Sequence, residues 1–435
     1  MSKLALHWQI AIAIFLAIVV GALFDKQTAI GGISLYGVCT FIGAMFLNGL
    51  KMVVVPLVLA SIICAVAGLG SGAGLGRLGG KTLGFYMASS LLAILVGLFF
   101  VNVMTPGIVD GVPAKEILNL SSSDELNAQL AKIEGRGAGD FAAVFLRMLP
   151  PNIVEAAANG QMLGLITFGL MFGFFMMRIK ESLRDTMQNF WQAVFETMMA
   201  ITMFIMKFAP IGVFGLIAKT ILATGFSALE PLAWFMLTVV LALATHTFIT
   251  LPAALKFVAR VSPIRHFQAM SPALLTAFST ASSSGTLPLT MKCVEKNAKV
   301  SNKTAGFVLP LGATVNMDGT ALYECVAAMF IAQAYGLELS IATQFLIVIT
   351  ALLTSVGVAG IPSASLVAIT VILAAIGLPA EGIGLLLLTD RILDMVRTSV
   401  NVFSDSVCAV VVAKTEGEQG VLAEPINTAK IVQEA

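Results

Sequence analysis

Charged side chains are scarce in this chain. Asp, Glu, Lys and Arg make up 11% of its 435 residues, against about 25% in soluble globular domains. The formal net charge is +1, which gives no basic excess and argues against a nucleic-acid partner. Hydrophobic residues make up 58%, with a mean hydropathy of +0.95. This composition is typical of a membrane protein.

Histidine and cysteine are also rare, and neither forms a pattern of known chemistry. The histidines are His7, His246 and His266, which are far from the polar motifs in sequence. The five cysteines lie in apolar surroundings or at a helix edge and lack metal-ligand spacing. A membrane enzyme needs a nucleophile with its base, or a metal cluster. The sequence shows neither, so we expect a protein that is not an enzyme.

Apolar runs long enough to cross a bilayer recur along the whole chain. They predict an all-α polytopic membrane protein with eight transmembrane helices, near residues 7–23, 35–66, 82–104, 161–177, 190–216, 232–257, 304–334 and 390–414. The glycine-rich stretch 68–80 precedes neither Lys-Ser nor Lys-Thr and follows no strand, so it is not a phosphate loop. We expect it to be a flexible connection.

The basic residues predict the topology. One set of connections is about three times richer in Lys and Arg than the other, which places it, and both termini, in the cytoplasm. For the number of membrane crossings to agree with this placement, each of two segments must enter and leave the membrane on the same side. The segment near 267–296 does so on the cytoplasmic side and the segment near 337–380 on the outside. Both carry a Gly/Ser/Pro break, at 278–288 and 356–365. Two interrupted segments in corresponding halves predict re-entrant hairpins at a transporter binding site.

A polar stripe runs along the last predicted span. Its members fall within an arc of about 100° on one helix face: Asp390, Asp394, Arg397, Thr398, Asn401 and Asp405. Such a stripe in a membrane marks a substrate or ion pathway. The preceding span is interrupted by Asn316-Met-Asp-Gly-Thr320, whose side-chain oxygens beside freed carbonyls suit a hard cation.

These motifs together resemble the glutamate transporter family. The resemblance is carried by SSSGTLP, NMDGT, the Gly-Ile-Pro tip and D-x₃-D-x₂-RT-x₂-N-x₃-D, in that order, and is densest over 267–414. It implies inverted repeats and a homotrimer with an elevator mechanism, taking up glutamate or aspartate with sodium. The implied scaffold domain is 1–78 and 106–225, the transport domain 79–105 and 226–416, and the cytoplasmic tail 417–435.

The resemblance also assigns residues to the substrate. Arg397 is expected to pair with the side-chain carboxylate of the substrate, because its planar guanidinium matches a carboxylate. Asp394 is expected to accept the ammonium group. The complete implied substrate set is Ser282, Ser283, Ser284, Thr320, Asp394, Arg397, Thr398 and Asn401.

Two or three sodium sites are implied in the same way. The first combines Asp405 with Asn316, Gly312 and Asn401. The deeper site combines Asp318 and Asn316 with Tyr86, Ser89 and Ser90 of the third span; from pattern alone these hydroxyls could equally bond their own or a neighbouring helix. The third site is implied at Thr314, Ser355, Val356 and Val358.

Three positions refine the resemblance. Animal glutamate carriers have an acidic residue where Glu324 stands, which implies proton cotransport and leaves potassium countertransport open; the alternative is a structural hydrogen-bonded glutamate. The family usually has an arginine at the position of Ala281 or of Met395, and here Arg391 is the candidate substitute.

Competing functions differ at two residues of the stripe. A neutral amino-acid carrier should lack Arg397, because a buried guanidinium without a partner is costly. A C4-dicarboxylate carrier has no ammonium group for Asp394 to accept. Both residues are present, which favours glutamate or aspartate. A substrate-gated anion channel is the alternative of another class, and we keep it as a secondary activity.

Overall fold

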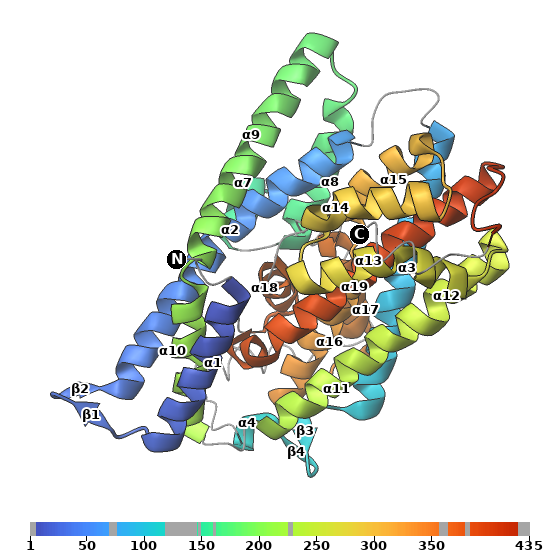
Figure 1. The fold of residues 1–435 in the computed structure, drawn as a ribbon. Helices are drawn as coiled ribbons and strands as arrows, with labels where there is room; N and C mark the ends of the chain where they lie inside the picture. The colour runs from blue at the N-terminus through green and yellow to red at the C-terminus, as the bar shows by residue number, and fades with distance from the viewer. Residues whose placement is uncertain are drawn as a thin grey trace, which may run out of the picture.

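The computed structural model describes residues 6–68, 76–117, 146, 149–159, 162–224, 229–355, 364–378 and 383–424. The chain is mostly helical (Figure 1). In the first half the helices are α1 Leu6–Leu23, α2 Leu35–Gly68, α3 Gly76–Met104, α4 Ala114–Ile117, α7 Ile153–Ala158, α8 Met162–Met176, α9 Glu181–Met206 and α10 Ala209–Thr224. In the second half they are α11 Leu229–Thr245, α12 Leu251–Ala253, α13 Pro263–Thr280, α14 Ser283–Lys292, α15 Asn302–Val315, α16 Asp318–Ala334, α17 Ile341–Ser355, α18 Ala364–Ile376 and α19 Ile383–Thr415.

Two small hairpins add strands to a fold expected to be all-α. One pairs β1 Ala29–Ile30 with β2 Ile33–Ser34, and the other pairs β3 Ile108–Val109 with β4 Val112–Pro113. The two-residue turns Gly31–Gly32 and Asp110–Gly111 have positive φ throughout. Such turns match the twist of paired strands, so they close tight hairpins between helices.

Three helical stretches among the described residues are long and apolar enough to cross a membrane: Arg77–Met104, Glu230–Ala259 and Thr389–Thr415. They correspond to the third, sixth and last predicted spans. Shorter apolar stretches among the described residues include Ile12–Leu23, Leu35–Phe46 and Gly164–Met176. The count of eight spans stays a prediction.

The predicted fifth span is wrong as a single helix. The structure has α9 and α10 there, separated at Lys207 and Phe208. The amides of both residues bond three residues back, at 3.1 and 2.9 Å, which tightens the last turn of α9. Pro210 then occupies the first turn of α10, where its missing N–H costs nothing.

The predicted flexible connection at 68–80 is shorter than expected. Helix α3 already begins at Gly76, and 69–75 lie outside the described residues. The predicted break in the seventh span lies between α15 and α16. The first predicted hairpin is the packed pair α13 and α14, joined at Ala281 with φ 49°. In the second, α17 packs against α18, and its tip at 356–363 lies outside the described residues.

The helices pack in two groups. In the first, α2 contacts α8, α9 and α10, and α10 contacts α1; α2 and α9 run side by side in Figure 1. In the second, α3, α11 and α17 pack on α16, while α13, α15 and α16 pack on α19. Every residue of α16 is buried, so this helix forms the centre of the second group.

Glu416 follows α19 and ties its end to the start of α3. Its carboxylate accepts hydrogen bonds from Arg77 Nη2 at 3.0 Å and Lys81 Nζ at 2.5 Å. These bonds, from Arg77 and then Lys81, lower the pKa of Glu416 to about 2. Because the pKa is depressed, the contact is fully present above the ordinary glutamate range and is lost as pH falls through about 2.

The next residues extend this contact, and we name residues 416–423 the C-terminal clasp. Glu418 accepts from Ser301 Oγ at 2.6 Å and from the Ser301 amide at 2.8 Å, at the start of α15. Arg265 Nη1 of α13 donates to the carbonyl of Ala423 at 2.8 Å, and the Leu422 side chain is buried. The clasp therefore joins one end of α3, α13, α15 and α19.

Helices α2 and α10 approach closely at Gly215, which gives a test of the packing. A Cβ there would lie 2.8 Å from the carbonyl oxygen of Cys39 and 3.0 Å from the amide of Gly43. We expect Gly215→Ala to lower the free energy of unfolding by about 1–3 kcal/mol, because backbone atoms must move. Thermal unfolding in detergent measures it. Gly84→Ala in α3 is the matched control, since its Cβ meets nothing within 4 Å among the described residues. Equal midpoints for both variants would contradict the packing.

Candidate functional site

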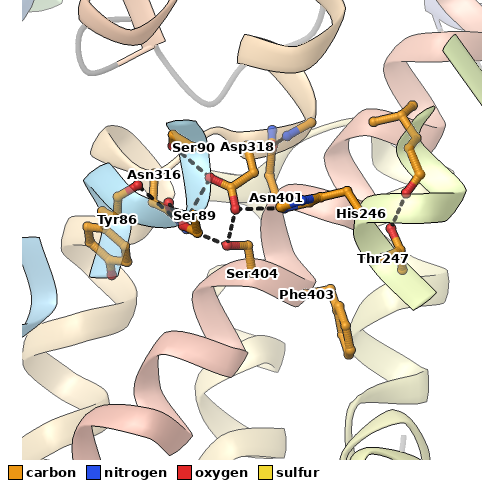
Figure 2. Close-up of polar contacts among 12 residues, drawn as sticks. Tyr86, Ser89, Ser90, His246, Thr247, Asn316, Asp318, Asn401, Phe403 and Ser404 are labelled. Atoms are coloured by element: carbon orange, nitrogen blue, oxygen red, sulfur yellow. Dashed lines mark hydrogen bonds and ion pairs between the residues drawn. The ribbon is translucent and has the colours of Figure 1, made fainter. Parts of the chain in front are cut away.

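The buried carboxylate of Asp318 is contacted by hydroxyl groups and an imidazole ring from three helical segments (Figure 2). Ser90 Oγ of α3 donates to Oδ1 at 2.6 Å, and Ser89 Oγ lies 3.2 Å from the same oxygen. Ser404 Oγ of α19 donates to Oδ2 at 2.6 Å, and His246 Nε2 lies 3.1 Å from it. Both oxygens of Asp318 are therefore engaged.

The chain folds this way because the helix is interrupted just before Asp318. Asn316 and Met317 leave the helical region, with φ −106° and −123°. Helix α16 restarts at Asp318, and the N-terminus of a helix stabilises a negative charge. The break thus brings a carboxylate and a side-chain amide into one polar cluster.

Asn316 connects this carboxylate to a second one. Its Nδ2 donates to Asp405 Oδ1 at 2.9 Å and to Ser404 Oγ at 3.0 Å. Its Oδ1 lies 3.4 Å from Ser89 Oγ. Asp405 is therefore linked to Asp318 through Asn316 and Ser404, which makes a continuous polar cluster between α3, α16, α19 and the end of α15.

Gly312 permits the close approach of α15 to Asp405. A Cβ at Gly312 would collide with the Asp405 carboxylate and would lie 2.7 Å from the Tyr86 hydroxyl. That hydroxyl donates to the carbonyl of Val308 at 2.7 Å. Tyr86 thus lies beside Gly312 and Asp405, while its neighbours Ser89 and Ser90 contact Asp318.

Arg397 is the largest fully buried side chain on α19. Its Nη2 donates to Asp390 Oδ1 at 3.1 Å and to Asp394 Oδ1 at 3.0 Å. The guanidinium also lies 3.7 Å from the centroid of the Tyr323 ring, a cation–π contact. Nε and Nη1 have no hydrogen-bond partner in the described part of the chain. Two donors of a buried cation are thus open to a further acceptor.

Arg391 also reaches the stripe. Its Nη1 lies 3.4 Å from Asp394 Oδ2, and both side chains are largely buried. Two carboxylates, Asp390 and Asp394, are therefore balanced by two guanidiniums. That Arg391 replaces the arginine usual in the family at Ala281 or Met395 stays a prediction.

Asn401 caps helix α16. Its Oδ1 accepts from the amide of Gly319 at 2.8 Å and lies 3.4 Å from the amide nitrogen of Thr320. Its Nδ2 donates to the Thr320 hydroxyl at 3.0 Å. Two of the orphan amides at a helix N-terminus are satisfied this way. In this structure, therefore, Asn401 and Thr320, two of the side chains assigned to the substrate, contact one another.

The other predicted site residues make local bonds. Ser282 Oγ accepts from the Gly285 amide at 3.1 Å and caps α14. Ser283 is buried and Ser284 is exposed. Three hydroxyls donate to backbone carbonyls of their own helices: Thr398 to Asp394, Thr314 to Leu311 and Ser355 to Leu352. Val356 and Val358 lie outside the described residues.

Glu324 lies two helical turns into α16 and is completely buried. Its Oε2 accepts from the Thr354 hydroxyl of α17 at 2.9 Å. Its Oε1 has no hydrogen-bond partner among the residues that the structure describes. This carboxyl group is therefore only half satisfied.

The cluster has the chemistry of a site for a hard cation. Hydroxyl, amide and carboxylate oxygens suit such ions, whereas softer metals prefer His and Cys. Among the described residues, no group of three or more His, Cys, Asp or Glu side chains could hold a metal. Oxygen ligands beside an interrupted helix are the arrangement in which membrane transporters hold coupling ions.

The family model described as the sodium:dicarboxylate symporter family matches residues 6–415. The chain belongs to this family. The resemblance seen in the motifs is thus confirmed, and the symporter is a transporter and not an enzyme. A multi-pass location in the cell membrane follows from the membership.

Several relatives align with nearly the whole symporter. The proton/sodium-glutamate symport protein of Geobacillus stearothermophilus is 35% identical over 421 residues, covering 96% of each chain. The proton/glutamate-aspartate symporter of Escherichia coli (strain K12) is 33% identical over 417 residues, covering 95% of this chain and 93% of its own. Human excitatory amino acid transporter 3 is 34% identical over 459 residues, covering 95% and 87%.

Four residues at the site had no role assigned from the sequence. Asp390 lay in the predicted stripe, and Ser404, seven residues after Arg397, shares its helix face, which was a usable signal. Tyr323 and His246 gave no such signal, because their contacts join helices far apart in the chain.

The Asn401 cap predicts a cost in stability. We expect Asn401→Leu to lower the free energy of unfolding by about 1–3 kcal/mol, because the buried Gly319 amide loses its acceptor. Thr389→Val is the matched control, since this buried hydroxyl on α19 bonds the carbonyl of Leu386 in its own helix. Thermal unfolding in detergent measures both variants. A midpoint for Asn401→Leu equal to that of Thr389→Val would mean that the cap contributes nothing.

Proposed function

We propose that the symporter takes up glutamate or aspartate coupled to sodium, with a proton carried by Glu324. The single observation that supports this best is Arg397, whose buried guanidinium beside Asp394 has two donor nitrogens without a partner among the described residues. A substrate with two carboxylates and one ammonium complements both groups. The relatives named as glutamate or glutamate-aspartate symporters support the same substrate class.

Substrate binding requires an exchange of partners on α19. In this structure Asp394 is bound to Arg397 and Arg391. An incoming carboxylate on Arg397 frees Asp394 for the ammonium group, and Asp390 keeps the guanidinium in place. A neutral amino acid supplies no such carboxylate, and a C4-dicarboxylate supplies no ammonium.

Sodium coupling follows from the charges of the cluster. Asp318 and Asp405 are buried with no Lys or Arg in ion-pair contact in the described part of the chain, and Asp318 has His246 beside it, so in our proposal bound cations offset the charge of the cluster. We assign one ion to Asp405, Asn316, Gly312 and Asn401, and a deeper one to Asp318, Asn316, Tyr86, Ser89 and Ser90. A third ion is assigned to Thr314 and the segment Ser355–Val358. Asn401, which is assigned both to an ion and to the substrate, links the two sites and bonds the Thr320 hydroxyl of the substrate set.

The two groups of helices support a division into a scaffold and a moving domain. The scaffold is 1–78 with 106–225, and the transport domain is 79–105 with 226–416, as the resemblance implies. Eight spans, two re-entrant hairpins related by inverted repeats, cytoplasmic termini and a homotrimer complete the proposal. In it, the transport domain carries the polar cluster across the membrane as an elevator.

Uptake into liposomes tests the function. Purified protein is reconstituted and given glutamate, aspartate, succinate or alanine under separate sodium, proton and potassium gradients. We expect accumulation of the acidic amino acids that requires an inward sodium gradient. Equal accumulation without sodium, or a preference for succinate or alanine, would overturn the proposal. A substrate-dependent anion current in the same liposomes would add the channel activity.

Arg397→Gln should abolish this accumulation. Two charge-assisted hydrogen bonds to the substrate are worth about 3–6 kcal/mol, so we expect a loss of about 100-fold or more in apparent affinity. The variant leaves Asp390 and Asp394 without their partner, so monodispersity in detergent must be checked first. Arg184→Gln, at an exposed ion pair with Glu181, is the control. Undiminished glutamate affinity in Arg397→Gln would rule out this contact.

Glu324→Gln should uncouple the proton. A buried carboxyl with one unpaired oxygen is costly as an anion, so in our proposal it is protonated for transport. We expect an inward proton gradient to accelerate sodium-driven uptake by the wild type and to leave the variant unaffected. Thr354→Val removes the hydroxyl donor but keeps the carboxyl, and should still respond to the gradient. If Glu324→Gln responds like the wild type, Glu324 is a structural residue.

A further inference from the structure

His246 lies in an irregular part of the span Glu230–Ala259. The residues His246–Thr250 form a π-helical segment, in which the Leu251 amide bonds five residues back to the carbonyl of His246. Pro252 follows directly and has no N–H to continue the regular ladder. Such widened turns often occur at functional sites. Here the turn presents a completely buried imidazole to the start of α16.

The imidazole and Ser404 hold one edge of the Asp318 carboxylate. His246 Nε2 lies 3.1 Å from Oδ2, and Ser404 Oγ donates to the same oxygen at 2.6 Å. We assign the ring proton to Nε2, the nitrogen that faces the carboxylate, because a carboxylate oxygen accepts hydrogen bonds. Figure 2 shows His246 and the α3 serines on different sides of Asp318.

The opposite edge has different neighbours. Oδ1 is contacted by Ser90 and Ser89, whose hydroxyl oxygens can rotate from donors to cation ligands. Oδ2 cannot be released so easily, because its donors come from two other helices. The carboxylate therefore has one edge held by His246 and Ser404 from two helices, and one edge held by two hydroxyls of α3.

We propose that His246 is a positioning residue for the deeper sodium site. Its Nε2–H fixes the plane of the Asp318 carboxylate so that Oδ1 faces Ser89, Ser90 and Asn316. The imidazole does not touch the ion. The inference rests on the proposed sodium coupling and adds a residue from the irregular part of the sixth predicted span to it.

The structure offers a matched control for a purely structural histidine. His266 is also completely buried, and its Nε2 lies 2.9 Å from the Ser406 hydroxyl. In both rings Nδ1 has no hydrogen-bond partner among the described residues. The two histidines differ in their partners: His246 contacts Asp318, an assigned sodium ligand, whereas His266 contacts Ser406, which is not one.

The test compares two amides at His246. His246→Gln keeps an N–H within reach of Asp318, whereas the shorter side chain of His246→Asn does not reach it. In liposomes we expect His246→Asn to raise the sodium concentration for half-maximal glutamate uptake by about 10- to 100-fold. The substrate KM at saturating sodium should change less than twofold. His246→Gln and His266→Asn should both stay within about threefold of the wild type.

A second measurement covers a variant that does not transport. Sodium, but not choline, should raise the unfolding temperature of purified wild type, and His246→Asn should need about 10- to 100-fold more sodium for the same rise. An unshifted sodium dependence in His246→Asn, or an equal shift in His266→Asn, would overturn the positioning role. A wild type that does not respond to sodium in either assay would instead refute the proposed function itself.

Discussion

Buried carboxylates that need partners constrain the second group of helices. Asp318, Asp390, Asp394 and Asp405 are all nearly inaccessible to solvent. An isolated buried charge is strongly destabilising, and removing one partner of a buried pair exposes that cost. Arg397 serves two of these acids, and hydroxyl and amide groups serve the other two. The donors come from α3, α15, α19 and the span Glu230–Ala259, so the acids position four segments relative to one another.

Two irregularities of the backbone meet at Asp318. One is the break at Asn316 and Met317, and the other is the π-helical segment before Pro252. Regular helices satisfy their own amides and carbonyls, so the groups left by a break must find partners elsewhere. Asn401 supplies that partner for α16. The interrupted helices thus bring backbone polar groups next to the polar side chains around Asp318. In an unbroken helix those backbone groups would bond one another.

The sequence was sufficient for the family, for the broken span at Asn316 and for most of the polar stripe. These features are local, because a helix face and an embedded Asn-Met-Asp-Gly-Thr are visible over a few residues. The position of His246 was not predictable in this way, since it depends on how two distant helices pack. The division between α9 and α10 was missed because the apolar pattern runs through Lys207 while the hydrogen-bond ladder stops there. The tip of the second hairpin falls outside the described residues.

The C-terminal clasp has a consequence for how the symporter can be handled. The end of α19 is followed by residues that bond Arg77, Lys81, Ser301 and Arg265. A fluorescent protein or affinity tag fused directly after Thr415 would displace these residues and remove the contacts that join the ends of α3, α13, α15 and α19. A fusion placed after Glu424 leaves all of the contacts intact. Reporter fusions of this carrier should therefore keep the first nine residues that follow α19.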